Sequence, residues 1–157
     1  MARIRKFRLC EDSSELGRMI RRTIQSCNSR DYPPKVIQLQ KKRFTEKRLS
    51  EGNYPRWVAV EKGKLVGTVA AKAESEISAL FVLPSYQGQG IGERLLKTAE
   101  NHIFRKCPKA KLHSSLGAAG FYLLNGYRKI KVETIGAKTV RFKVVLMEKD
   151  APKRSFS

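Results

Sequence analysis

The stretch Leu80-Phe81-Val82-Leu83-Pro84-Ser85-Tyr86-Gln87-Gly88-Gln89-Gly90-Ile91-Gly92 decides the fold of this chain. An apolar run typical of a buried strand ends at a proline, glycines follow at alternate positions, and a helical pattern then begins. Such a junction leaves several backbone N–H groups unpaired at a helix N-terminus, where the helix dipole adds positive potential. Glycine lets a phosphate approach the backbone without interference from a Cβ atom. The stretch therefore predicts a site for a phosphate-bearing cofactor.

On either side of this stretch, apolar residues recur at the spacings of strands and helices. Alternating and β-branched runs predict strands over residues 4–9, 57–61, 65–71, 76–83, 111–116, 127–134 and 140–148. The turn Lys62-Gly63-Lys64 joins the second and third of these strands in a hairpin. The strand over 76–83 is expected to place Ile77, Ala79, Phe81 and Leu83 on one face, with Leu80 and Val82 on the other. Both faces of the sheet are therefore expected to be covered.

Helix boundaries are indicated by capping and turn residues. Asp12 and Glu15 have the spacing of a capping box, so the first helix is expected to begin there and to end around residues 28–30. Pro33 and Pro34 predict the start of a second helix, which runs to about residue 49. Residues 91–107 are expected to form a third helix, and residues 118–125 a fourth that Gly126 ends.

The order of these elements predicts an α/β or α+β domain over residues 1–150, with no internal repeat, linker or second domain. The strand–helix–strand unit over 76–116 predicts two parallel strands joined by a right-handed crossover. We therefore expect a mixed, mostly antiparallel sheet of about seven strands flanked by about four helices. Residues 151–157 are expected to form a disordered basic tail.

Length and composition narrow the class of protein. The 157 residues suit one compact domain, and 41% hydrophobic residues argue against wholesale disorder. No segment approaches the roughly 20 apolar residues of a membrane span, and the basic N-terminus lacks the apolar block of a signal peptide. We expect a cytoplasmic protein without membrane attachment. Cys10, Cys27 and Cys107 form no metal or disulfide pattern, so we interpret them as reduced, mostly buried thiols and expect no metal.

The charge of the chain is strongly positive. Lys and Arg total 33 against 14 acidic residues, which gives a net charge of +19. Such a field attracts polyanions through counterion release and repels small cationic substrates. The same charge also suits a solvated surface that keeps a protein soluble. Composition therefore leaves open whether the chain has an acidic protein or RNA as a partner.

Three kinds of phosphate-binding glycine loop compete at residues 87–92. A P-loop requires Gly-Lys-Ser/Thr at the start of the helix, whereas Glu93 and Arg94 follow Gly92 here. A dinucleotide fingerprint requires a third glycine where Glu93 stands. The third kind fits: Gln87-x-x-Gly90-x-Gly92 after a strand resembles the acetyl-CoA motif of the GNAT superfamily of N-acetyltransferases.

A second segment carries the same resemblance. Ala118-x-x-Phe121-Tyr122-x-x-x-Gly126-Tyr127 is similar to the A-x-x-F-Y-x-x-x-G-F segment that follows the fifth strand in that superfamily. The expected element order also matches, so the resemblance covers nearly the whole chain and implies the GNAT fold. It further implies acetyl-CoA as the cosubstrate. The residues that it assigns to acetyl-CoA are Leu80, Phe81, Val82, Gln87, Gly88, Gln89, Gly90, Ile91, Gly92, Ser115, Ala118 and Tyr122.

Within that set, the resemblance implies different contacts. Backbone N–H groups over residues 89–92 hold the pyrophosphate, with residues 87 and 88 at the entry of the loop, and the backbone of residues 80–82 pairs with the pantetheine arm. A Phe81 or Val82 N–H group is placed to polarise the thioester carbonyl. Ser115 stands where the family often has Asn, and its hydroxyl is expected to bond a pantetheine amide.

Acetyl transfer to an amine requires two proton transfers, and the resemblance implies a group for each. Tyr122 matches the general acid that protonates the departing thiolate. Glu76 lies in the strand region where many members carry a carboxylate general base, and Glu74 is the alternative. Because packing also explains single histidines, we interpret His113 as a core or edge residue and His102 as a surface residue without a partner.

The resulting hypothesis is an acyltransferase that moves acetyl from acetyl-CoA directly to a primary amine in a ternary complex. The charge of +19 favours an amine carried on an acidic protein or a polyanion such as RNA. The alternative hypothesis is a nucleic-acid-binding protein that keeps the GNAT fold with weak or absent catalysis. The sequence leaves open whether the chain is a monomer or a homodimer.

Overall fold

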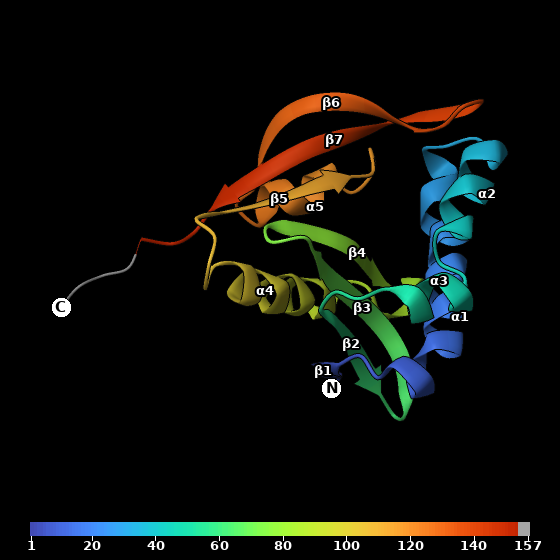
Figure 1. Cartoon of the computed structure of the whole chain (residues 1–157), viewed down its shortest axis with the longest axis horizontal. Coiled ribbons are helices and arrows are strands. Elements are labelled where there is room, and N and C mark those ends of the chain that lie inside the picture. Colours follow the sequence, from blue (N-terminus) through green and yellow to red (C-terminus); the bar gives the residue numbers. More distant parts are fainter. Residues whose placement is uncertain (154–157) are drawn as a thin grey trace.

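The computed structural model describes residues 1–153, which form a seven-stranded sheet flanked by helices (Figure 1). Residues 154–157 of the expected tail lie outside the described residues. The elements in chain order are β1 (Arg3–Lys6), α1 (Leu9–Cys27), η1 (Asn28–Arg30), α2 (Pro34–Lys42), α3 (Glu46–Glu51), β2 (Arg56–Glu61), β3 (Lys64–Lys72), β4 (Glu76–Val82), η2 (Pro84–Tyr86), α4 (Ile91–Ile103), β5 (Lys109–Ser114), α5 (Ala119–Leu124), β6 (Arg128–Ala137) and β7 (Val140–Asp150). The labels η1 and η2 denote short 3₁₀ helices.

The strands lie in the order β1-β2-β3-β4-β5-β7-β6. Neighbouring strands are antiparallel except for β4 and β5, which are parallel and are joined through α4. The expected mixed sheet with one parallel βαβ unit is therefore confirmed. Among the described residues the α-helices number five rather than about four, because the second predicted helix is divided.

Helices cover both faces of the sheet. Helix α4 packs on one face of β2, β3 and β4, while α1 packs on the other face with α2 and α3 beside it (Figure 1). Leu16, Ile20 and Ile24 of α1 and Leu95 and Ala99 of α4 are almost fully buried, so the helical stripes read from the sequence form the core. Among residues 1–153, no helix is long and apolar enough to cross a membrane.

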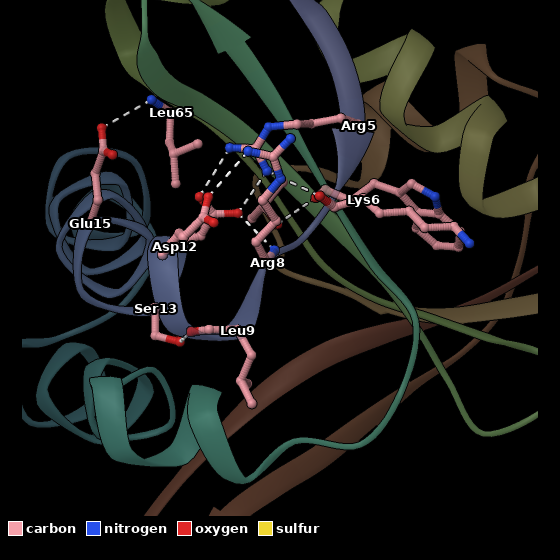
Figure 2. A network of polar contacts seen from close by, with 11 residues as sticks. Arg5, Lys6, Arg8, Leu9, Asp12, Ser13, Glu15 and Leu65 are labelled. Carbon is pink, nitrogen blue, oxygen red and sulfur yellow. Dashed lines mark hydrogen bonds and ion pairs between the residues drawn. The ribbon is translucent and has the colours of Figure 1, made fainter.

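Helix α1 begins three residues before the predicted capping box. Asp12 lies in its first turn and accepts a hydrogen bond from the Arg8 backbone N–H group at 2.8 Å. The same carboxylate accepts two hydrogen bonds from the Arg5 guanidinium of β1, at 2.7 and 3.0 Å (Figure 2). Glu15 accepts instead from the Leu65 N–H group of β3. These acidic residues join α1 to the sheet, so the predicted box is wrong.

The second predicted helix divides at residues 43–45. Arg21 of α1 donates a hydrogen bond to the carbonyl of Phe44 at 2.7 Å, which removes that carbonyl from helical pairing. Thr45 then caps α3 by accepting from the Arg48 N–H group. A contact from another helix therefore ends α2, and the sequence of the segment alone does not reveal it.

Strand β4 contains a bulge that changes which side chains share a face. Ser78 pairs with Ala70, and Phe81 pairs with Thr68. Between these two pairs, β4 therefore contains one residue more than β3. Ala79 has a φ of +53° at this point. Ser78 and Phe81 consequently lie on the same face, and Ile77 lies on the other. The predicted shared face of Ile77 and Phe81 is wrong.

Candidate functional site

The parallel strands β4 and β5 meet at one end and separate at the other. Glu76 pairs with Lys111, and beyond this pair the two strands have no further register contact. A cavity of about 360 Å³ opens where they separate, between the bulged part of β4 and the C-terminal half of β5. Residues of α1, α2, β6 and β7 complete its walls. The separation leaves the edge of residues 80–82 free to pair with an extended ligand.

A second cavity of about 890 Å³ lies along the glycine loop. It is lined by most of the residues predicted to bind the cofactor, namely Leu80, Val82, Gln87, Gly88, Gly90, Gly92, Ser115, Ala118 and Tyr122. Phe81 lines the first cavity instead, whereas Gln89 and Ile91 line neither. Ile91 is 3% exposed and belongs to the core, so only its backbone is available to a ligand.

The glycine loop has the backbone geometry of an anion cradle. Gly88 and Gly90 have φ values of +77° and +82°, and a Cβ atom on either would meet open space. Gly90 is the N-cap of α4 and offers no side chain to its first turn. Within residues 1–153, none of the backbone N–H groups from Gly88 to Gly92 donates a hydrogen bond. These donors and the dipole of α4 suit a phosphate or pyrophosphate group.

The Gln87 side chain joins the elements around the loop. Its amide donates to the Val82 carbonyl at 2.9 Å and to Cys27 Sγ at 3.4 Å. Cys27 ends α1 and lines both cavities, a position that sequence reasoning did not predict. Cys10 is exposed, and Cys27 and Cys107 are partly buried, so the interpretation of mostly buried thiols is wrong.

Tyr122 lies at the junction of the two cavities and lines both. Its ring packs edge-on against Phe121 and Tyr127, with centroids 5.2 and 5.7 Å away. Burial raises the pKa of its phenol well above the ordinary value, so the hydroxyl is protonated at neutral pH. The hydroxyl makes no hydrogen bond within residues 1–153, and its oxygen is not completely buried. It is therefore available as a donor to a molecule in the cavities.

Glu76 lines the first cavity where β4 and β5 meet, beside His113 of β5. Its Oε1 atom is 3.6 Å from His113 Nδ1, and Glu133 of β6 contacts the opposite ring nitrogen at 2.9 Å. His113 is one-third exposed on a central strand, so the interpretation as a core or edge residue is wrong. His102 is a surface residue as expected, but it packs against Trp57.

Tyr32 holds the wall of the first cavity in place. Its hydroxyl donates to the Lys143 carbonyl of β7 at 2.6 Å and accepts from the Leu116 N–H group at 3.1 Å. Three chain segments that are distant in sequence thus meet at one hydroxyl. Burial raises the pKa of Tyr32, which keeps the hydroxyl protonated for this role.

The first cavity carries positive charge as well as the carboxylate of Glu76. The Arg43 guanidinium lies 5.8 Å from the centroid of the Phe142 ring, and both residues line the cavity with Lys72. Neither Arg43 nor Lys72 forms an ion pair in the part of the chain that the structure describes. These cations are available to an anionic group of a ligand.

The fold and the two adjoining cavities suit a domain that holds a phosphate-bearing molecule next to a second molecule. A family model described as "Acetyltransferase (GNAT) domain" matches residues 29–150. The chain therefore belongs to the GNAT acetyltransferase family, and the predicted family and enzyme class are confirmed. No curated protein matches the chain at a significant level.

Solved structures share the fold at low sequence identity. A GCN5-related N-acetyltransferase from Rhodopseudomonas palustris is 20% identical with a TM-score of 0.89, and the match covers 96% of each chain. PaiA N-acetyltransferase from Thermoplasma acidophilum, solved with coenzyme A, is 22% identical with a TM-score of 0.75 over 96% of this chain and 99% of that one. YncA, a putative acetyltransferase from Salmonella typhimurium solved with acetyl-CoA, is 19% identical with a TM-score of 0.64 over 100% and 98%.

The PaiA and YncA structures contain coenzyme A and acetyl-CoA respectively, which agrees with the cosubstrate predicted from the glycine loop. The described residues contain no group of three or more His, Cys, Asp or Glu side chains that is placed to hold a metal ion.

Proposed function

We propose that this protein transfers the acetyl group of acetyl-CoA to a primary amine by direct attack within a ternary complex. The observation that carries the proposal is the junction of two cavities at the free hydroxyl of Tyr122. The glycine loop lines one cavity, and Glu76 lies in the other. Donor and acceptor can therefore approach each other from different sides.

The N–H groups over residues 88–92 are proposed to bind the pyrophosphate of acetyl-CoA. The free edge of β4 then pairs with the pantetheine arm, which directs the thioester toward Tyr122. A Phe81 or Val82 N–H group polarises the thioester carbonyl, and the Ser115 hydroxyl bonds the arm. This geometry holds the reactants in one orientation, which is a large part of catalysis in bimolecular reactions.

Glu76 is proposed to remove one proton from the acceptor ammonium, which frees the nitrogen lone pair for attack on the thioester carbonyl carbon. The new C–N bond forms as the carbonyl becomes tetrahedral, and collapse of this intermediate breaks the C–S bond. Tyr122 donates its proton to the departing thiolate and recovers one from the amide nitrogen. The products are an acetylated amine, coenzyme A with a free thiol, and one released proton.

We further propose that the acceptor amine is carried on an anionic molecule. Arg43 and Lys72 line the acceptor cavity together with Glu76, so the cavity offers contacts for an anion and for an ammonium group. The net charge of +19 disfavours polycationic acceptors and increases the association rate of acidic ones. An acidic protein or a nucleic acid that bears a primary amine fits this description.

The test is an acceptor screen that measures thiol release from acetyl-CoA with peptides, amine-bearing metabolites and RNA as acceptors. Tyr122→Phe is expected to lower kcat about 100-fold while coenzyme A affinity changes little, which is typical of losing a general acid. Tyr127→Phe is the matched control, because that hydroxyl bonds Glu100 at 2.7 Å and lines neither cavity.

Two results would contradict the proposal. The first is the failure of acetyl-CoA and coenzyme A to bind at micromolar concentration. The second is RNA binding that weakens steeply with salt, with no thiol release from any acceptor and no effect of Tyr122→Phe. The second result would favour a nucleic-acid-binding protein.

A further inference from the structure

His113 lies between two carboxylates that come from different strands. Its Nδ1 atom is 3.6 Å from Glu76 of β4, and its Nε2 atom is 2.9 Å from Glu133 of β6. His113 pairs with Leu146 of β7, which in turn pairs with Lys131, so the ring and the Lys131 and Glu133 side chains lie on one face. Glu76 shares this face through its pairing with Lys111. The three side chains therefore form a line across the sheet.

The contact with Glu133 determines which ring nitrogen carries the proton. The hydrogen bond from His113 lowers the pKa of Glu133, so its carboxylate is ionised at neutral pH and can only accept. The Nε2 atom must then carry a hydrogen, and the neutral ring keeps its lone pair on Nδ1. That lone pair faces Glu76 at the end of the acceptor cavity.

Charged groups of β3, β5 and β6 surround His113 and its two carboxylate neighbours. Lys131 lies 3.4 Å from the second oxygen of Glu133 and holds the carboxylate from its far side. Lys72 is the register partner of Glu76 on β3, and Lys111 is its partner on β5. Among the described residues, Glu76 and Glu133 are the acidic groups in contact with the ring. An imidazolium at this position is therefore flanked by two carboxylates.

We propose that His113 is the final acceptor of the proton that the acceptor ammonium loses, and that Glu133 is the positioning residue that keeps its Nδ1 lone pair toward the cavity. This inference rests on the proposed acetyltransferase function. Glu76 takes the proton from the ammonium and passes it to Nδ1, which forms an imidazolium. After the product leaves, Nδ1 releases the proton to solvent, which reaches the one-third exposed side chain. The second amine proton goes to the thiolate through Tyr122, so one proton is released in each turnover.

Two acceptor probes separate this role from a structural one. O-Phosphoethanolamine has an alkylammonium group that must lose a proton before attack, and it carries an anionic group. Hydroxylamine is neutral at neutral pH and attacks without that step. In His113→Gln, kcat/KM for O-phosphoethanolamine is expected to fall about 100-fold, the scale of a lost base, while acetohydroxamate formation from hydroxylamine stays within about twofold.

Variants of the positioning residue refine the comparison. Glu133→Val removes the acceptor of the Nε2 hydrogen and is expected to lower kcat/KM for O-phosphoethanolamine about tenfold. Glu133→Gln keeps an acceptor oxygen and should restore part of that loss. His102→Gln on α4 and Glu148→Gln on β7 are matched controls, because neither residue lines the acceptor cavity.

A nitrogen-resolved NMR spectrum of the imidazole side chains tests the arrangement without any acceptor. The chain has two histidines, so His102 serves as the internal reference. His113 is expected in the Nε2–H tautomer in the wild type and in a mixture of tautomers in Glu133→Val. An Nδ1–H tautomer in the wild type would overturn the proposal.

The outcomes also distinguish the two proposals. A wild-type protein that acetylates neither probe and no acceptor of the screen contradicts the proposed function, and the role of His113 falls with it. An active wild type whose His113→Gln variant loses both probes equally, or loses neither, overturns the role of His113 alone. If the wild type accepts hydroxylamine only, the tautomer decides: Nε2–H supports the proposal and Nδ1–H refutes it.

Discussion

Replacing Gly90 by alanine tests whether the left-handed turn of the glycine loop is needed to bind coenzyme A. Gly90 has a φ of +82°, and an added Cβ atom would meet nothing within 4 Å. The substitution therefore introduces no clash, and its cost is the backbone strain of an L-residue in this conformation. That strain is about 1–2 kcal/mol.

The strain in Gly90→Ala can lower the stability of the fold, or it can weaken the binding of coenzyme A. If the loop keeps its shape, the folded protein loses the full amount, which lowers the melting temperature by about 2–8 °C for a chain of this size. If the loop relaxes, the N–H groups over residues 90–92 turn away from the pyrophosphate. A loss of about 1.4 kcal/mol in binding then corresponds to a tenfold weaker Kd for coenzyme A. We expect Gly90→Ala to show both effects, with a Kd about tenfold higher.

Gly63→Ala is the matched control. Gly63 lies in the β2–β3 turn with a φ of +76°, and its added Cβ atom would also meet open space. The same strain should lower its melting temperature to the same extent, while its Kd for coenzyme A stays at the wild-type value. Thermal unfolding and isothermal titration calorimetry measure the two quantities. Equal Kd values for Gly90→Ala and Gly63→Ala at equal losses of stability would show that the loop conformation does not contribute to binding.

Three further predictions concern polar contacts that hold the fold. Asp12→Asn should cost about 2–3 kcal/mol of unfolding free energy in urea at neutral pH, because it removes charge-assisted hydrogen bonds. Burial acts to raise the pKa of Asp12, but hydrogen bonds from Arg5 and the backbone outweigh it and lower the pKa below the usual 3.8. The ionised Asp12 carboxylate thus stabilises the fold above its usual pKa, and this stabilisation is lost as the pH falls through the lowered pKa. The unfolding free energies of the wild type and Asp12→Asn should therefore converge in acid, and a difference that stays constant with pH would contradict this. Tyr32→Phe should lower stability by about 1–2 kcal/mol and speed amide exchange at residues 115–117, and unchanged exchange would contradict its bridging role. Glu100→Gln should lower the unfolding free energy by about 2–3 kcal/mol, because Glu100 is 6% exposed and contacts Lys149 at 3.0 Å. An unchanged melting temperature would contradict this prediction.

The parts of the fold that depend on neighbouring residues could be predicted from the sequence. Pro84, the alternate glycines and the helical stripe after them fix the β4–α4 junction through short-range backbone chemistry. Gly126 ends α5 with a φ of +91° for the same kind of reason. The pairing of β4 with β5 followed from the length of the connection between them. Such features need no knowledge of distant segments.

The features that the sequence did not reveal depend on contacts between distant segments. The bulge at Ala79 appears only against the register of β3, and it reverses the face of Phe81. The break before α3 depends on a hydrogen bond from Arg21 of α1. The contact of His113 with Glu133 spans β7, because the strand order β5-β7-β6 places them one strand apart. Knowledge of that strand order is the signal by which this contact could have been found.

The transfer of labelled acetyl from acetyl-CoA to an amine can be followed by mass spectrometry of the acceptors in the screen. Wild-type protein is expected to place the label on the nitrogen of a primary amine, with one equivalent of free coenzyme A for each amide formed. Tyr122→Phe should slow this transfer, and Tyr127→Phe should not. Label that stays in acetyl-CoA, or appears only as acetate with every acceptor, would contradict the proposed N-acetyltransferase function.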